Sequence, residues 1–84
     1  MARELWGIPL SELATDRQQA ALRADEAARD GERVAADPKE SPLIRAQAKV
    51  GARYAREHAR DYRYEAELFA AGEIPECYWT DGPA

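Results

Sequence analysis

The sequence of 84 residues has few of the groups that stabilise or activate small proteins. It contains one cysteine, Cys77, one histidine, His58, and no cluster of metal ligands. A single cysteine excludes a disulfide within the chain. Leu, Ile, Val and Phe together number only 12 of the 84 residues, which is below the level at which a chain normally builds a core of its own. We therefore expect the chain to fold with help, through self-association or within a larger assembly.

Long apolar runs are also absent. No run approaches the roughly 18 residues that a membrane-spanning helix requires, and the N-terminal residues MARELWGIPL lack the layout of a signal peptide. These features predict a protein of the reducing cytoplasm, or of a particle assembled there, without contact with a membrane. The net charge of −4 and the pI near 5.0 argue against nucleic-acid binding by the chain as a whole.

The clearest structural signal lies in residues 41–72. Ser41 is a favourable helix N-cap, and Pro42 follows at the first helical position, where a missing N–H does no harm. Gly72 supplies the left-handed residue that ends many helices. Between these ends there is no other proline, and alanine, arginine and glutamate are frequent. The sequence predicts a helix over residues 41–71.

A first helix is predicted over residues 10–36. Ser11 is one candidate N-cap, and Thr15 with Gln18 forms a capping-box pattern that marks another possible start. The apolar side of this helix is nearly all alanine. The polar connection 37–40 contains Pro38, so the two helices should be antiparallel neighbours joined by a short turn.

The predicted fold is all-α, a single small domain built as an antiparallel helical hairpin. The segment 1–9 before the helices is expected to be extended or turned, and the segment 73–84 after them to be non-helical, because both contain proline and glycine. On the second helix, a seam of residues at spacings of three and four is expected to contact the first helix. The seam consists of Ile44, Ala48, Gly51, Ala55, His58, Tyr62, Ala66 and Phe69.

The register of the hairpin follows from its turn. With the turn centred near Lys39, residues whose numbers sum to about 78 should face each other. This places Arg17 opposite Asp61, and each of them interrupts the apolar side of its helix. We predict this ion pair, with Glu65 one turn further on as the second choice.

Six basic residues follow the second helix at spacings of three or four and lie within about 80° of arc, on the face away from the seam. They are Arg45, Lys49, Arg53, Arg56, Arg60 and Arg63. Such a stripe could follow a phosphate backbone, with Tyr64 stacking on a base. The same pattern is typical of a solvated face whose charges pair with nearby acids, and we favour that interpretation.

Large apolar residues gather near the two ends of the chain, which an antiparallel hairpin brings together. The sequences LWGIPL and IPECYW should meet there, either as a small core that closes the hairpin or as a docking surface. The apolar side chains of the second helix beside the seam would widen such a surface. Our candidates for a protein interface are Trp6, Ile8, Val50, Tyr54, Leu68, Phe69, Ile74, Tyr78 and Trp79.

The raw materials of catalysis are sparse. His58 lies near Asp61, Tyr62 and Glu65 on one helical face, but the position three residues before His58 is alanine, so the Glu-x-x-His pattern of carboxylate metal sites is not present. Cys77 has no histidine close to it in sequence, and we interpret it as an ordinary thiol. We expect no enzyme activity, no cofactor and no metal.

The function favoured by the sequence is that of a non-catalytic structural or assembly subunit that acts through protein–protein contacts, with a viral particle as one such setting. Two alternatives stay open. One is a nucleic-acid-binding hairpin that uses the basic stripe, and the other is a small regulator or inhibitor that docks through its tryptophan-bearing end.

Overall fold

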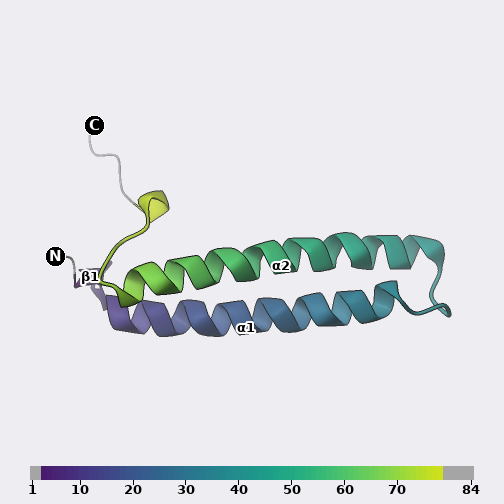
Figure 1. The fold of residues 1–84 in the computed structure, drawn as a ribbon, viewed down its shortest axis with the longest axis horizontal. Helices are drawn as coiled ribbons and strands as arrows, with labels where there is room; N and C mark the ends of the chain where they lie inside the picture. Colours follow the sequence, from purple (N-terminus) through teal and green to yellow (C-terminus); the bar gives the residue numbers. More distant parts are fainter. Residues whose placement is uncertain (1–2, 79–84) are drawn as a thin grey trace.

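The computed structural model describes residues 3–78 and contains two long helices, α1 (Leu10–Ala35) and α2 (Pro42–Ala70). They are preceded by two short antiparallel strands, β1 (Glu4–Leu5) and β2 (Ile8–Pro9), and followed by a 3-10 turn, η1 (Glu76–Tyr78). Figure 1 shows the two helices running antiparallel and side by side along their whole length, so that the strands and η1 lie at the same end. The predicted helical hairpin is confirmed. Neither helix of this described part has the length and apolar character needed to cross a membrane.

The ends of α2 follow the local signals in the sequence. The Ser41 hydroxyl accepts a hydrogen bond from the backbone N–H of Ile44 at 3.2 Å, as an N-cap should. At the other end Gly72 has a φ of 81°, and the N–H of Glu73 donates to the carbonyl of Leu68 at 2.8 Å. This bond satisfies one of the carbonyls that the end of a helix leaves without a partner.

The start of α1 differs from the prediction. Within the described residues no side chain caps its first turn, and both Ser11 and Thr15 lie inside the helix, where the Thr15 hydroxyl donates to the Ser11 carbonyl. The backbone provides the cap instead, because the N–H of Leu10 donates to the carbonyl of Arg3 at 2.9 Å. The β1–β2 hairpin therefore sets where α1 begins.

The tight turn of that hairpin consists of Trp6 and Gly7, with φ values of 57° and 76°. Two successive residues with positive φ are typical of the turns that join two-stranded hairpins. The sequence predicted an extended or turned segment here, which is correct, but it did not predict that the strands would pair.

The contact between α1 and α2 is made of small residues. Alanines at every seventh position are buried on both helices: Ala14, Ala21, Ala28, Ala52, Ala59 and Ala66. A repeat of seven keeps the contact facing the partner helix only if the two helices wind gently around each other. Side chains this small let the backbones approach closely. At Gly31 an added Cβ would lie 3.0 Å from the Ala48 carbonyl oxygen and 3.1 Å from the Ala52 Cβ.

The observed contact seam of α2 is therefore rotated by about one residue from the predicted seam. Ala66 and Phe69 are buried as expected, but Gly51 and His58 are exposed and Ile44 is 40% exposed. Their place in the contact is taken by Ala52 and Ala59. The predicted seam, which also consists mostly of small residues, follows the period of a straight helix, whereas an alanine repeat of seven sets the actual contact.

Among residues 3–78, the only large side chains of the core lie at the open end of the hairpin. Within the described residues one cluster of buried side chains contains Leu10, Leu13, Ala14 and Phe69, and Leu5, Ile74 and Tyr78 pack against it. The predicted meeting of the two chain ends is confirmed for these residues. Trp79, the second tryptophan of the prediction, lies outside the described residues.

Candidate functional site

A polar network joins α1, α2 and η1 beside this cluster. Arg17 donates from Nε to the Glu65 Oε1 at 2.9 Å and from Nη2 to the Tyr78 hydroxyl at 3.1 Å. The Tyr78 hydroxyl donates in turn to the same Glu65 oxygen at 2.7 Å. Arg17 also binds Asp16 at 2.6 Å. The network holds the C-terminal segment against both helices.

The Arg17 pair corrects the predicted register. Arg17 pairs with Glu65, the second choice, and the pair with Asp61 that we preferred is wrong. Facing residues have numbers that sum to about 80, and the sum is 82 for Arg17 and Glu65. The observed register is therefore offset by half a turn or more from the one predicted from a turn centred near Lys39, so the position of the turn alone does not fix which residues face each other.

Burial and hydrogen bonding change the protonation of this network. Burial raises the pKa of the Tyr78 hydroxyl, and its hydrogen bond to the Glu65 carboxylate raises that pKa further, because ionisation would place two negative charges together. Burial opposes the charge on Arg17, but hydrogen bonds to Tyr78 and Glu65 outweigh it and raise the pKa of Arg17. Tyr78 is therefore held as the neutral donor.

Replacing Tyr78 with phenylalanine should lower the free energy of unfolding by about 1 kcal/mol near neutral pH, since Glu65 loses a donor. The folded-state pKa of Tyr78 lies above its ordinary value of 10.0. Its contribution to stability is thus complete below pH 10 and is lost as the pH rises through the folded pKa. Urea unfolding of the wild type and of Tyr78→Phe between pH 8 and pH 11 should show that the difference between their free energies of unfolding decreases as the pH rises. A difference that does not change with pH would contradict this assignment.

Aromatic rings cover the open end. Trp6 meets Tyr78 edge to face, with ring centroids 5.3 Å apart, and Tyr78 lies 5.8 Å from Phe69. Trp6 is still 63% exposed and Ile8 is 38% exposed. The end is both a closed core, through Phe69, and an exposed aromatic edge, through Trp6.

The sequence predicted that the basic stripe lies on the face of α2 that points away from α1, and this position is wrong. The stripe runs along the edge of α2 that borders α1, where two of its members meet acids. Arg56 binds Glu32 at 2.8 Å and Asp25 at 3.3 Å, and Arg63 binds the other oxygen of Asp25. Arg56 lowers the pKa of the Glu32 carboxyl, chiefly through its hydrogen bond. Part of the stripe therefore works as a set of interhelical ion pairs, as the solvated-face interpretation predicts.

The face of α2 turned away from α1 carries a different set of residues. These residues follow one another at spacings of three or four, with one spacing of seven. We call this set the outer face, and it consists of Leu43, Val50, Tyr54, Glu57, Asp61, Tyr64 and Leu68. Its apolar members are open to solvent: Leu43 is 66% exposed, Val50 is 50% exposed and Tyr54 is 58% exposed. Tyr64 is 61% exposed.

In the described part of the chain, the opposite side of the molecule has no such surface. The side of α1 turned away from α2 is exposed and polar, with Glu12, Asp16, Gln19, Arg23, Glu26 and Asp30 along it. The exposed apolar side chains of the two helices are thus concentrated on α2, apart from Leu22 on α1. The molecule therefore has an exposed apolar stripe on one side and a charged stripe on the other.

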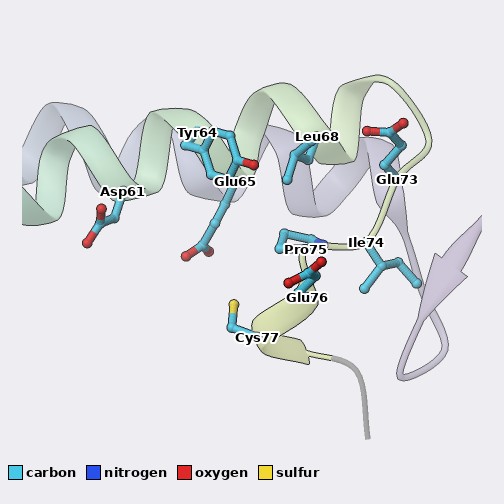
Figure 2. A pocket seen from close by; sticks show the side chains of 9 residues that line it. All are labelled: Asp61, Tyr64, Glu65, Leu68, Glu73, Ile74, Pro75, Glu76 and Cys77. Atoms are coloured by element: carbon cyan, nitrogen blue, oxygen red, sulfur yellow. The ribbon is translucent and has the colours of Figure 1, made fainter.

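A groove lies between the last turns of α2 and the segment that follows it, with a volume of about 920 Å³. Figure 2 shows its lining, with Asp61, Tyr64, Glu65 and Leu68 from α2 facing residues of the C-terminal segment. That segment contributes Glu73, Ile74, Pro75, Glu76 and Cys77. The groove has an apolar floor and an acidic rim, and it continues the outer face.

The sequence did not single out this groove. Glu73 and Glu76 were treated as part of a tail, because only the fold back of residues 73–78 onto α2 brings them near Asp61. Asp25 is only 9% exposed, and its neighbours in the sequence do not distinguish it from the other acids of α1. Asp25 and Glu32 are seven residues apart, and so are Arg56 and Arg63. This equal spacing is the feature of the sequence that could have predicted the interhelical ion pairs.

The residues considered for chemistry are not gathered into a site. His58 is exposed and meets Tyr62 edge to face at 6.4 Å, and Cys77 is an exposed free thiol. Residues 3–78 contain no group of three His, Cys, Asp or Glu side chains that could hold a metal ion. Comparisons with models of protein families, with curated proteins and with solved structures found no match to this chain.

Proposed function

We propose that this protein is a non-catalytic assembly subunit that acts through protein–protein contact, with the outer face of α2 as its working surface. The observation that supports this most directly is the exposure of Leu43, Val50 and Tyr54 on one side of one helix. Apolar side chains at heptad spacing on an exposed helix are typical of helix-to-helix contact. The single exposed thiol, Cys77, accords with a reducing cytoplasm as the place of assembly.

The thin core supports the same proposal. The seam between α1 and α2 consists of alanines, each of which removes little apolar surface from water, so the hairpin gains little stability along most of its length. Covering the outer face would add large side chains to a second seam on α2. Contact with a partner is thus a source of stability as well as the function.

The two alternative functions have less support. A nucleic-acid site needs cations that are free to meet phosphates, whereas Arg56 and Arg63 are engaged with Asp25 and Glu32. A regulator that docks through Trp6 would use the open end of the hairpin, but that tryptophan already packs against Tyr78. The outer face is the longer surface, because its exposed apolar and aromatic side chains extend from Leu43 to Tyr64 along α2.

The proposal is tested by measuring the size of the protein in an extract of the cells that encode it. We expect the tagged wild-type chain to elute from a sizing column well above the mass of one chain, 9.4 kDa plus the tag. The variant Tyr54→Lys should move to the monomer position, because a charge would have to be buried in the contact. Leu22→Lys, an equally exposed leucine on α1, is the matched control and should elute like the wild type. Elution of the wild type as a monomer would overturn the proposal.

A further inference from the structure

We infer that the partner on the outer face is a second copy of this chain, with the two α2 helices packed antiparallel and the two hairpins forming a four-helix arrangement. This inference rests on the proposed function and names its partner. Three features carry it: the division of charge along α2, the register of the outer face, and the position of the acidic groove.

Charge is divided sharply between the two halves of α2 and the segment after it. Residues 42–56 contain four basic side chains and no acidic one. Residues 57–76 contain six carboxylates and two arginines. A helix of this kind repels a parallel copy of itself, since like halves would meet, and attracts an antiparallel copy, since each basic half would meet an acidic half.

The outer face is also self-complementary in the antiparallel sense. If residues whose numbers sum to 111 face each other, Leu43 meets Leu68 of the second copy and Val50 meets Asp61. Tyr54 then meets Glu57 of the second copy, next to the two-fold axis. Every member of the outer face has a counterpart on the same face except Tyr64, whose counterpart is Gln47, also exposed. A two-fold interface requires this kind of self-matching.

The apolar contacts lie mainly at the two ends of this register and the acids lie near its middle. Lys49 and Arg53 flank the outer face and come within about one turn of Asp61 and Glu57 of the second copy. Glu57 and Asp61, the two acids of the otherwise apolar outer face, thereby gain cationic partners. The flanking basic residues that α1 does not engage gain carboxylates.

The groove provides the place for the end of the second helix. Its floor contains Leu68, and its rim carries Glu73 and Glu76. In the antiparallel register the first turn of the second α2, which carries Leu43, reaches this groove. Figure 1 shows the segment after α2 on the side of α2 away from α1. The groove belongs to the outer face, because Asp61, Tyr64 and Leu68 of that face line it.

The register is tested by disulfide cross-linking in a Cys77→Ser background. Val50 and Asp61 are both exposed on the outer face, and they are about 16 Å apart along one helix, too far for a disulfide within the chain. The double variant Val50→Cys, Asp61→Cys should therefore oxidise to a covalent dimer. Val50→Cys alone and Asp61→Cys alone should stay monomeric on a denaturing gel, but an equal mixture of the two should cross-link.

The charge argument is tested by a swap. Light scattering over a range of concentrations should show that purified wild-type protein is a dimer. Arg53→Glu should raise the dissociation constant by about tenfold or more, and Arg53→Glu combined with Glu57→Arg, the acid nearest to it across the two-fold axis, should restore most of the affinity. Tyr54→Lys should raise the dissociation constant by at least about 30-fold.

Three results would overturn the inference. Cross-linking of Val50→Cys alone would show parallel packing, and a dimer that no cysteine variant cross-links would place the contact on another face. A purified wild-type protein that is monomeric at all concentrations would exclude the second copy. If that monomer still elutes in a large species from the cell extract, a different protein covers the outer face and the proposed function stands. Monomer in both experiments would remove both proposals.

Discussion

Replacing Phe69 with alanine is expected to lower the free energy of unfolding by about 3–5 kcal/mol. Phe69 is 1% exposed and is the largest fully buried side chain in the described part of the chain. It packs among Leu10, Leu13 and Tyr78 at the open end, while the rest of the interhelical seam is alanine. A domain of this size has a total stability of only about 5 kcal/mol. The variant should therefore be largely unfolded at 37 °C.

The measurement is urea unfolding followed by circular dichroism at 222 nm, with wild type and variant at the same protein concentration. Leu22→Ala is the matched control, because it removes a large apolar side chain from an exposed position on α1, where Leu22 is 61% exposed. The control should change the stability by about 0.5 kcal/mol or less. A loss at Phe69 no larger than that at Leu22 would mean that the end cluster does not close the hairpin.

The sequence was sufficient to predict those parts of the fold that depend on local chemistry. Ser41, Pro42 and Gly72 mark the ends of α2 through hydrogen bonds and φ angles that involve only their near neighbours. The antiparallel arrangement followed from the shortness of the connection. The meeting of the chain ends, seen in the contact of Trp6 with Tyr78, followed from that arrangement in turn.

The parts that the sequence did not predict depend on how the two helices wind around each other. A shift of a few residues in register changed the partner of Arg17 from Asp61 to Glu65. A rotation of about one residue replaced Gly51 and His58 in the seam with alanines. Alanine is frequent on several sides of α2, so periodicity alone cannot determine which of its alanines face α1.

The candidate site was predicted in part for the same reason. Val50, Tyr54 and Leu68 were named as interface candidates, because their apolar character is visible in sequence. Glu73 and Glu76, whose carboxylates line the groove together with Leu68, come from a segment whose position depends on the Tyr78 network. No local pattern connects that segment to α2, so only the folded chain brings these acids to the outer face.

Substituting alanine for glycine should have opposite effects at the two glycines within the helices. At Gly51, on α2, no described atom outside the neighbouring backbone lies within 4 Å of an added Cβ. Gly51→Ala should raise the free energy of unfolding by about 0.5–1 kcal/mol, because alanine loses less backbone entropy when a helix forms. At Gly31, on α1, the added Cβ would meet the Ala48 carbonyl oxygen at 3.0 Å and the Ala52 Cβ at 3.1 Å.

Neither of those neighbours is the end of a flexible side chain, so the two backbones must move apart to admit the methyl group. Overpacking of this kind costs about 1–3 kcal/mol and outweighs the gain in helix propensity. We therefore expect Gly31→Ala to lower the stability, measured by urea unfolding beside Gly51→Ala. Because both variants make the same chemical change within a helix, propensity cancels in the comparison, and the difference between them reports how closely α1 and α2 approach. Equal effects at the two positions would mean that the helices are further apart at Gly31 than the alanine seam requires.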